Sequence, residues 1–188
     1  MKKGFVFGFV GALVKVIFPY KLVFKGEVPR EGSLVACANH LSYIDFFFVH
    51  DAIGRHVSFM AKKELTRFKI FDYFMKKNNI IPVNRNANDI TAIKRSLKVL
   101  KSGNVLGIFP EGTRKYKNKT DEFHNGAAMV AIRTASPVVP IRIISKNDRV
   151  RVFRRSTVII GEPIDLGGIK DYDEASRIIK EKIYSLEI

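Results

Sequence analysis

A histidine and an aspartate separated by four residues form the first pair in the sequence that could do chemistry. His40 and Asp45 lie in the stretch NHLSYID. Histidine gains and loses a proton near neutral pH, and a carboxylate on its second ring nitrogen fixes the tautomer and stabilises the imidazolium. Such a pair can take the proton from a hydroxyl group while the oxygen attacks a carbonyl carbon. The substrate would supply that hydroxyl.

The geometry of this pair requires a junction between a loop and a helix. In one ideal helix, side chains five positions apart point roughly 140° away from each other. With Ser42 as the N-cap, Asp45 is the third helical residue, and its carboxylate points back towards the loop that holds His40. The alternative is that Asp45 only completes a capping interaction and His40 is an ordinary polar loop residue.

Phosphate recognition is the second chemistry, and it is predicted for the stretch FPEGTR, residues 109–114. Arg114 presents a planar fork of donors suited to a phosphate monoester. Gly112 allows close approach of the backbone, Thr113 adds a hydroxyl donor, and Glu111 would orient these groups. The alternative is a Pro-Gly turn that carries ordinary surface charges.

Short apolar runs alternate with longer helical runs from Ser33 onward, which predicts an α/β layer fold. The predicted strands are residues 34–38, 57–60, 80–83, 105–109, 138–144 and 157–160. The predicted helices are residues 44–53, 89–100, 126–134 and 171–186. The two stretches above and Arg85 each follow a predicted strand, and ligands in open α/β sheets gather at the carboxyl ends of strands.

Composition limits the classes of partner. The chain of 188 residues is 46% hydrophobic, which fits one globular domain with a sizeable core. Its formal net charge of +15 attracts nucleic acid, an anionic membrane surface or phosphorylated ligands. A nucleic-acid module would interleave basic residues with exposed aromatics, whereas most phenylalanines here fall in apolar runs such as residues 46–48. We therefore expect no nucleic acid as a partner.

The single cysteine, Cys37, excludes an intrachain disulfide and favours a reducing, cytosol-facing location. It precedes His40 by three residues in an apolar strand, so the two side chains are expected on opposite faces. We interpret Cys37 as a buried structural residue and not as a nucleophile. The histidines show no metal-ligand spacing, and no metal site is predicted.

The first 24 residues differ in character from the rest of the chain. Residues 5–18 are apolar or glycine except for Lys15. This run is shorter than the stretch of about 20 apolar residues that a spanning helix needs. We predict that residues 1–24 form a membrane-interface segment and residues 25–188 the main domain. A signal peptide and a buried core helix are the alternatives, although no small-residue cleavage site follows the apolar run.

The order of these motifs resembles the glycerophospholipid acyltransferase family, specifically the 1-acyl-sn-glycerol-3-phosphate acyltransferases. The first block of that family is a histidine, four residues and an aspartate, usually after asparagine, and residues 39–45 are similar to it. Residues 62–65 and 80–85 resemble the second block, residues 109–114 the third, and residues 138–141 the fourth. Four ordered blocks make the resemblance specific.

The resemblance implies a single mixed sheet flanked by helices, with His40 as general base and Asp45 as the residue that orients it. The implied acceptor-phosphate site comprises Arg85, Glu111, Gly112, Thr113 and Arg114, with Lys62 as a further phosphate candidate. Asn84 stands where an acidic residue is common in the family, which leaves the acceptor headgroup open.

The implied reaction joins an acyl thioester and a lysophospholipid at the cytoplasmic face of the cell membrane. The sn-2 hydroxyl of 1-acyl-glycerol-3-phosphate would attack the thioester of acyl-CoA or acyl carrier protein, which gives phosphatidic acid without a cofactor. An anionic membrane surface is the expected partner. The alternatives are another acceptor, such as glycerol-3-phosphate or another lysolipid, and a thioesterase that activates water with the same histidine.

Overall fold

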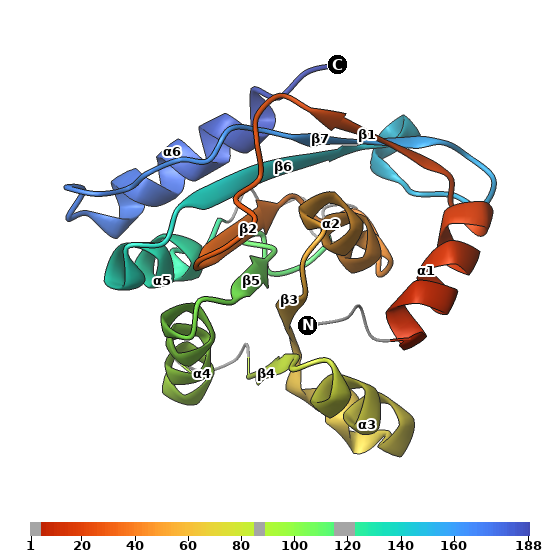
Figure 1. Cartoon of the computed structure of the whole chain (residues 1–188), viewed down its shortest axis with the longest axis horizontal. Coiled ribbons are helices and arrows are strands. Elements are labelled where there is room, and N and C mark those ends of the chain that lie inside the picture. Colours follow the sequence, from red (N-terminus) through yellow and green to blue (C-terminus); the bar gives the residue numbers. More distant parts are fainter. Residues whose placement is uncertain (1–4, 85–88, 115–122) are drawn as a thin grey trace.

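The computed structural model describes residues 5–84, 89–114 and 123–188, and within them seven strands form one sheet in the order β1-β7-β6-β2-β5-β3-β4 (Figure 1). The strands are β1 (Tyr20–Phe24), β2 (Leu34–Ala38), β3 (Val57–Lys62), β4 (Ile81–Val83), β5 (Val105–Ile108), β6 (Val138–Ile144) and β7 (Ser156–Ile160). The helices are α1 (Phe5–Ile17), α2 (Asp45–Ile53), α3 (Lys69–Lys77), α4 (Ile90–Lys101), α5 (Gly126–Thr134) and α6 (Tyr172–Tyr184).

The sheet is mixed, as predicted. Strands β2 to β6 run parallel to one another, whereas β7 pairs antiparallel with β6 and β1 pairs parallel with β7. The carboxyl ends of β2 to β6 therefore meet at one edge of the sheet. Because β1 and β7 run the other way, the start of β1 and the connection between β6 and β7 lie at the same edge.

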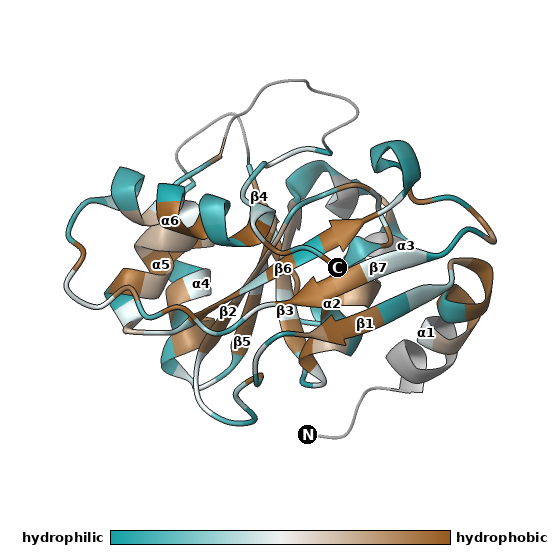
Figure 2. Ribbon diagram, turned by 90° about the horizontal axis from the view of Figure 1, so that it is seen from above, coloured by the Kyte–Doolittle hydropathy of each residue, from teal (hydrophilic) through white to brown (hydrophobic). Residues whose placement is uncertain are grey.

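Helices cover both faces of the sheet (Figure 1). One buried cluster joins the sheet to α2 and to the end of α1, and the other joins it to α4, α5 and α6. All five residues of β2 are buried, which explains why this strand is a continuous apolar run and does not alternate. Hydrophobic residues accordingly concentrate in the strands and on the helix sides that face them (Figure 2).

The predicted elements agree closely with the structure in the central sheet. Helix α5 and strands β2 and β6 have the predicted bounds, and β3, β4, β5, β7, α2, α4 and α6 differ by a few residues at their ends. Strand β1 and helix α3 were not predicted. Residues 20–24 pair with β7 and so belong to the sheet, although they fall within the segment assigned to the membrane interface.

None of the helices in the described residues is long and apolar enough to cross a bilayer.

Candidate functional site

The candidate site begins where the chain leaves β2. Asn39 is buried, and its side chain bonds the backbone of Ile143 twice: Nδ2 donates to the carbonyl oxygen at 2.9 Å, and Oδ1 accepts from the amide at 2.6 Å. The side-chain amide of Asn39 thus continues the pairing of β2 with β6 beyond the last backbone hydrogen bonds between the two strands. The next residue, His40, is thereby held at the carboxyl edge of the sheet.

His40 and Asp45 meet in the structure as the spacing predicted. The Nδ1 atom of His40 lies 2.9 Å from Oδ2 of Asp45, whose side chain is fully buried. The same oxygen accepts the backbone N–H groups of Leu41 at 2.6 Å and Ser42 at 2.7 Å. A carboxylate only accepts hydrogen bonds, so the imidazole donates from Nδ1 and keeps Nε2 as its proton acceptor.

The predicted capping role of Ser42 is wrong. Helix α2 begins at Asp45, and its N-cap is Ile44, which makes no side-chain hydrogen bond to the helix. Asp45 is therefore the first helical residue and not the third. The loop amides of Leu41 and Ser42 donate to its carboxylate, and its own amide donates to the backbone carbonyl oxygen of Ser42 at 3.2 Å. One carboxylate thus fixes both the loop and the imidazole.

An aromatic stack supports one face of the imidazole. The ring of His40 lies on that of Phe109, with centroids 4.3 Å apart and an interplanar angle of 21°. Phe109 in turn stacks on Phe59 of β3 with centroids 5.9 Å apart. The side chain of His40 retains 15% of its exposure, so one part of the ring remains accessible while the rest is held by packing.

We predict that Gly107→Ala lowers the free energy of unfolding by about 1–3 kcal/mol through this stack. Gly107 lies in β5, and an added Cβ would overlap the ring of Phe59 and approach Cγ1 of Val57 to 2.8 Å. Displacement of Phe59 would also disturb the rings stacked on it. Thermal denaturation measures the change. Gly126→Ala is the matched control, since its Cβ would meet nothing within 4 Å, and an equal loss there would contradict the prediction.

Glu111 joins the two motifs of the site. Its Oε2 accepts the backbone N–H of His40 at 3.2 Å, and its Oε1 accepts the hydroxyl of Tyr184 at the end of α6. Burial first, and then the hydrogen bond to Glu111, raises the pKa of Tyr184, so the phenol stays protonated and remains a donor. Glu111 therefore orients the backbone at His40. The role of Tyr184 was not predicted from the sequence, because this residue belongs to no motif and is 73 positions away from Glu111.

We predict that Tyr184→Phe lowers kcat by about threefold to tenfold, because Glu111 loses one of its two fixed partners while the ring still fills its site. Steady-state turnover measures the effect. Tyr172→Phe on the opposite end of α6, where the hydroxyl accepts from Arg133, is the control and should leave turnover unchanged. Equal rates for wild type and Tyr184→Phe would exclude a positioning role for this phenol.

Residues 112–114, the rest of the FPEGTR stretch, approach the loop of residues 41–44 through Arg114. Gly112 has φ of 66°, a conformation that favours glycine, and a Cβ there would lie 2.8 Å from Nε2 of His124. The amide of Thr113 donates to the carbonyl oxygen of Glu111 at 2.7 Å. Arg114 donates to the hydroxyl of Tyr43 at 2.8 Å, and its guanidinium lies 3.6 Å from that ring centroid. Arg114 is thus placed over the loop between His40 and Asp45.

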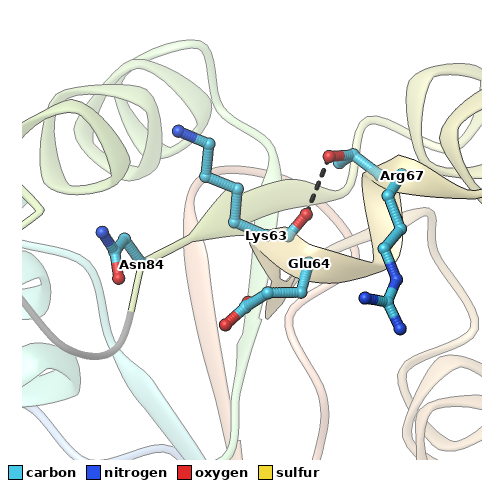
Figure 3. A pocket seen from close by; sticks show the side chains of 5 residues that line it. Lys63, Glu64, Arg67 and Asn84 are labelled. Carbon is cyan, nitrogen blue, oxygen red and sulfur yellow. Dashed lines mark hydrogen bonds between the residues drawn. The ribbon is translucent and has the colours of Figure 1, made fainter.

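A second basic region lies farther along the same edge. Lys62 ends β3 and forms an ion pair of 3.2 Å with Glu64. Glu64 helps to line an open pocket of about 400 Å³ at the ends of β3 and β4 (Figure 3). The pocket is lined by Lys63, Glu64, Thr66, Arg67 and Asn84. The predicted phosphate ligand Arg85 directly follows Asn84 and lies outside the described residues.

The structure therefore joins Asp45 and Glu111 to His40 by hydrogen bonds and places Arg114 against Tyr43 in the loop that follows His40. Lys62 belongs instead to the neighbouring basic region.

Cys37 is buried, as predicted. Burial raises the pKa of its thiol, so the nucleophilic thiolate is disfavoured. Its side chain packs in the cluster with α5 and α6, whereas Ala36 and Ala38 face the cluster that contains α2. These contacts do not suit a covalent acyl carrier.

The mixed sheet and its flanking helices have the fold of a solved acyltransferase. The crystal structure of the 1-acyl-sn-glycerophosphate acyltransferase PlsC from Thermotoga maritima superposes with a TM-score of 0.72 at 22% identity, over 97% of this chain and 80% of that one. A family model described as Acyltransferase matches residues 21–144. The chain therefore belongs to the acyltransferase family.

Relatives with assigned names agree with this classification. A 1-acyl-sn-glycerol-3-phosphate acyltransferase of Bacillus subtilis is 31% identical over 147 residues, 77% of this chain and 73% of the relative. A protein of the same name from Borreliella burgdorferi is 26% identical over 133 residues, 68% of this chain and 53% of the relative. The chain thus spans about half to three quarters of the length of these relatives.

Proposed function

We propose that this protein transfers a fatty acyl group to the sn-2 hydroxyl of 1-acyl-glycerol-3-phosphate and produces phosphatidic acid. The names of the relatives from Bacillus subtilis and Borreliella burgdorferi support this acceptor. The observation that carries the reaction type is the contact between His40 and the buried carboxylate of Asp45. It leaves Nε2 of the imidazole as the proton acceptor at the carboxyl edge of the sheet.

The proposed reaction is a direct transfer between two substrates. Nε2 of His40 accepts the proton of the acceptor hydroxyl as the oxygen forms a bond to the thioester carbonyl carbon. Asp45 stabilises the imidazolium that results. Collapse of the tetrahedral intermediate breaks the bond between carbon and sulfur, and the imidazolium returns the proton to the thiolate. The products are the ester and the free thiol of the carrier.

The acceptor phosphate is assigned to the cationic groups at the same edge. Arg114 lies beside the catalytic loop and presents the planar fork of donors that suits a phosphate monoester. Thr113 and the backbone at Gly112 are close to it in the same turn. Lys62 at the end of β3 and Arg85, which follows β4 in the sequence, are proposed as further phosphate ligands. Glu111 is assigned to orient the backbone at His40.

The proposed donor is the thioester of acyl-CoA or of acyl carrier protein, and the proposed location is the cytoplasmic face of the cell membrane. Helix α1 supports the membrane contact, because Leu13 and Val16 are exposed on it and Lys15 lies between them. The helix ends where β1 begins, at the edge that carries His40. Replacing Leu13 and Val16 by serine should weaken sedimentation with anionic vesicles, and unchanged sedimentation would contradict an interfacial role for α1.

The decisive experiment for the activity measures free thiol release from acyl-CoA by the purified protein in detergent. Release that requires 1-acyl-glycerol-3-phosphate supports the transferase. Glycerol-3-phosphate and a lysophosphatidylcholine, offered as separate acceptors, test the headgroup. Release at the same rate without any acceptor would show a thioesterase and overturn the proposal. The same assay with acyl carrier protein as donor identifies the carrier.

A further inference from the structure

The connection between β6 and β7 combines positive charge with exposed apolar side chains. Residues 146–155, KNDRVRVFRR, contain five basic residues and one acidic residue. Arg151, Arg154 and Arg155 are exposed, as are Val152 and Phe153, which retain 50% and 73% of their exposure. We call residues 149–155 the arginine loop. Its two exposed apolar side chains, Val152 and Phe153, lie between Arg151 and Arg154 in the sequence.

The backbone of the arginine loop adopts a conformation that its sequence does not favour. The amide of Arg154 donates to the carbonyl oxygen of Arg151 at 3.2 Å, which closes a four-residue turn. Phe153 is the third residue of that turn and has φ of 55°, where glycine is preferred and a bulky side chain is rare. Its ring is exposed, so packing within the protein does not compensate for the strain. An exposed residue held in such a conformation motivates a hypothesis of function.

The arginine loop is nevertheless held in a fixed place beside α1. The amide of Phe153 donates to the carbonyl oxygen of Ile17 at 2.7 Å, and that of Ser156 donates to Pro19 at 3.0 Å. Val150 packs against the buried cluster that includes α2. Figure 1 shows this connection next to the end of α1. Because β6 ends at the carboxyl edge of β2, the loop also lies at the edge that carries His40.

We propose that the arginine loop is a second membrane-contact element, which inserts Phe153 and Val152 among lipid headgroups while its arginines bind anionic phosphates. An aromatic side chain with flanking cations is suited to the interface of an anionic bilayer. Helix α1 and the arginine loop then form one contact surface at the edge of the sheet that carries His40. This proposal extends the membrane association proposed above, and it can be tested without turnover.

The exposed aromatic residue distinguishes a membrane from other anionic partners. Nucleic acid or an acidic protein could also bind three exposed arginines through charge alone. An aromatic side chain held in a strained turn at the tip adds apolar area, which a bilayer interface accepts. The location beside α1 favours the same partner, because Leu13 and Val16 are exposed on that helix.

The charge of the arginine loop is tested with the full chain and vesicles of phosphatidylcholine, alone or mixed with phosphatidylglycerol. A triple variant, Arg151→Gln with Arg154→Gln and Arg155→Gln, should weaken binding to the mixed vesicles by about tenfold or more, since each cation near the surface contributes about fivefold. The control triple, Arg30→Gln with Lys98→Gln and Lys101→Gln, removes the same charge near the amino ends of β2 and β5. It should bind within about twofold of wild type.

The aromatic contact is tested with Phe153→Gly, which relieves the strain at φ of 55° and should leave the melting temperature equal or higher. Binding to mixed vesicles should nevertheless fall about fivefold or more. Phe153→Trp should restore binding, because tryptophan favours the interface. Phe24→Ala, an exposed aromatic at the opposite edge, is the control and should not change binding.

The possible outcomes test the membrane contact of the arginine loop separately from the acyltransferase activity. If wild type binds mixed vesicles and both the loop variants and the controls bind equally well, the proposal is wrong while the acyltransferase assignment is unaffected. If the triple variant binds vesicles normally but has a higher KM for the thioester donor in detergent, the loop contacts the donor and the proposal is also wrong. Selective loss of vesicle binding with normal turnover in detergent supports it.

Discussion

His40→Ala is expected to lower the rate of acyl transfer by about 10³-fold or more at saturating substrates. Among the described residues of the proposed site, the imidazole is the group for which the geometry provides both a proton-accepting nitrogen and a buried counter-charge. Without it, the acceptor hydroxyl must lose its proton to water. Release of free thiol from acyl-CoA in the presence of 1-acyl-glycerol-3-phosphate measures the rate.

The fold of this variant should survive the substitution. Asp45 keeps its hydrogen bonds to the amides of Leu41 and Ser42, so the loop remains attached to α2. Lost packing against Phe109 and the lost hydrogen bond should together cost about 1–3 kcal/mol of stability. His124→Ala is the matched control, because that histidine lies over Gly112 at the same edge. A full rate in His40→Ala, or an equal loss in both variants, would contradict the proposed mechanism.

The central sheet could be predicted because its residues leave little choice. The run LVACA is apolar throughout, as expected for a strand with helices on both faces, and all five of its residues are buried. The spacing of His40 and Asp45 likewise permits a contact only across a junction between loop and helix, and the structure has one there. Local patterns thus located the strand, the helix and the pair between them.

Strand β1 was missed because its sequence gives a weak local signal. The stretch YKLVF pairs on one side only, with β7, and its residues are half-buried or exposed, so no strict alternation marks it. Its place in the sheet depends on a partner strand more than 130 positions later in the chain. Only the long-range pairing fixes such an edge strand.

The partners of Glu111 could not be predicted for a related reason. The sequence suggested that Glu111 orients phosphate ligands, whereas in the structure it contacts the His40 amide and the Tyr184 hydroxyl. Tyr184 reaches the site because α6 packs against β6 and α5, an arrangement set by the whole sheet. Contacts that depend on how a terminal helix docks carry no signature in a short motif. The capping error at Ser42 arose differently, since the helix begins at Asp45 and the amide of Asp45 donates to the backbone carbonyl oxygen of Ser42.

Asp45→Asn is expected to lower kcat by about 10²–10⁴-fold with a smaller effect on stability. An amide oxygen in the place of Oδ2 can still accept the N–H groups of Leu41 and Ser42, so the loop keeps its shape. The negative charge that would stabilise the imidazolium is gone. If the amide turns its nitrogen towards His40, the imidazole must accept at Nδ1 and is held in the wrong tautomer for a base at Nε2.

A comparison with Asp45→Ala separates the electrostatic from the structural role of this carboxylate. In the alanine variant the backbone N–H groups of Leu41 and Ser42 both lose their acceptor, and that of Leu41 is buried. This variant should therefore lose about 2–4 kcal/mol of stability together with activity. Asp45→Asn should lose activity to a similar degree with about 1–2 kcal/mol of destabilisation, measured by denaturant unfolding. Substantial activity in Asp45→Asn would mean that the carboxylate only shapes the loop. Because the same oxygen accepts from both the loop and the imidazole, only the substitution that preserves the acceptor and removes the charge can decide between these roles.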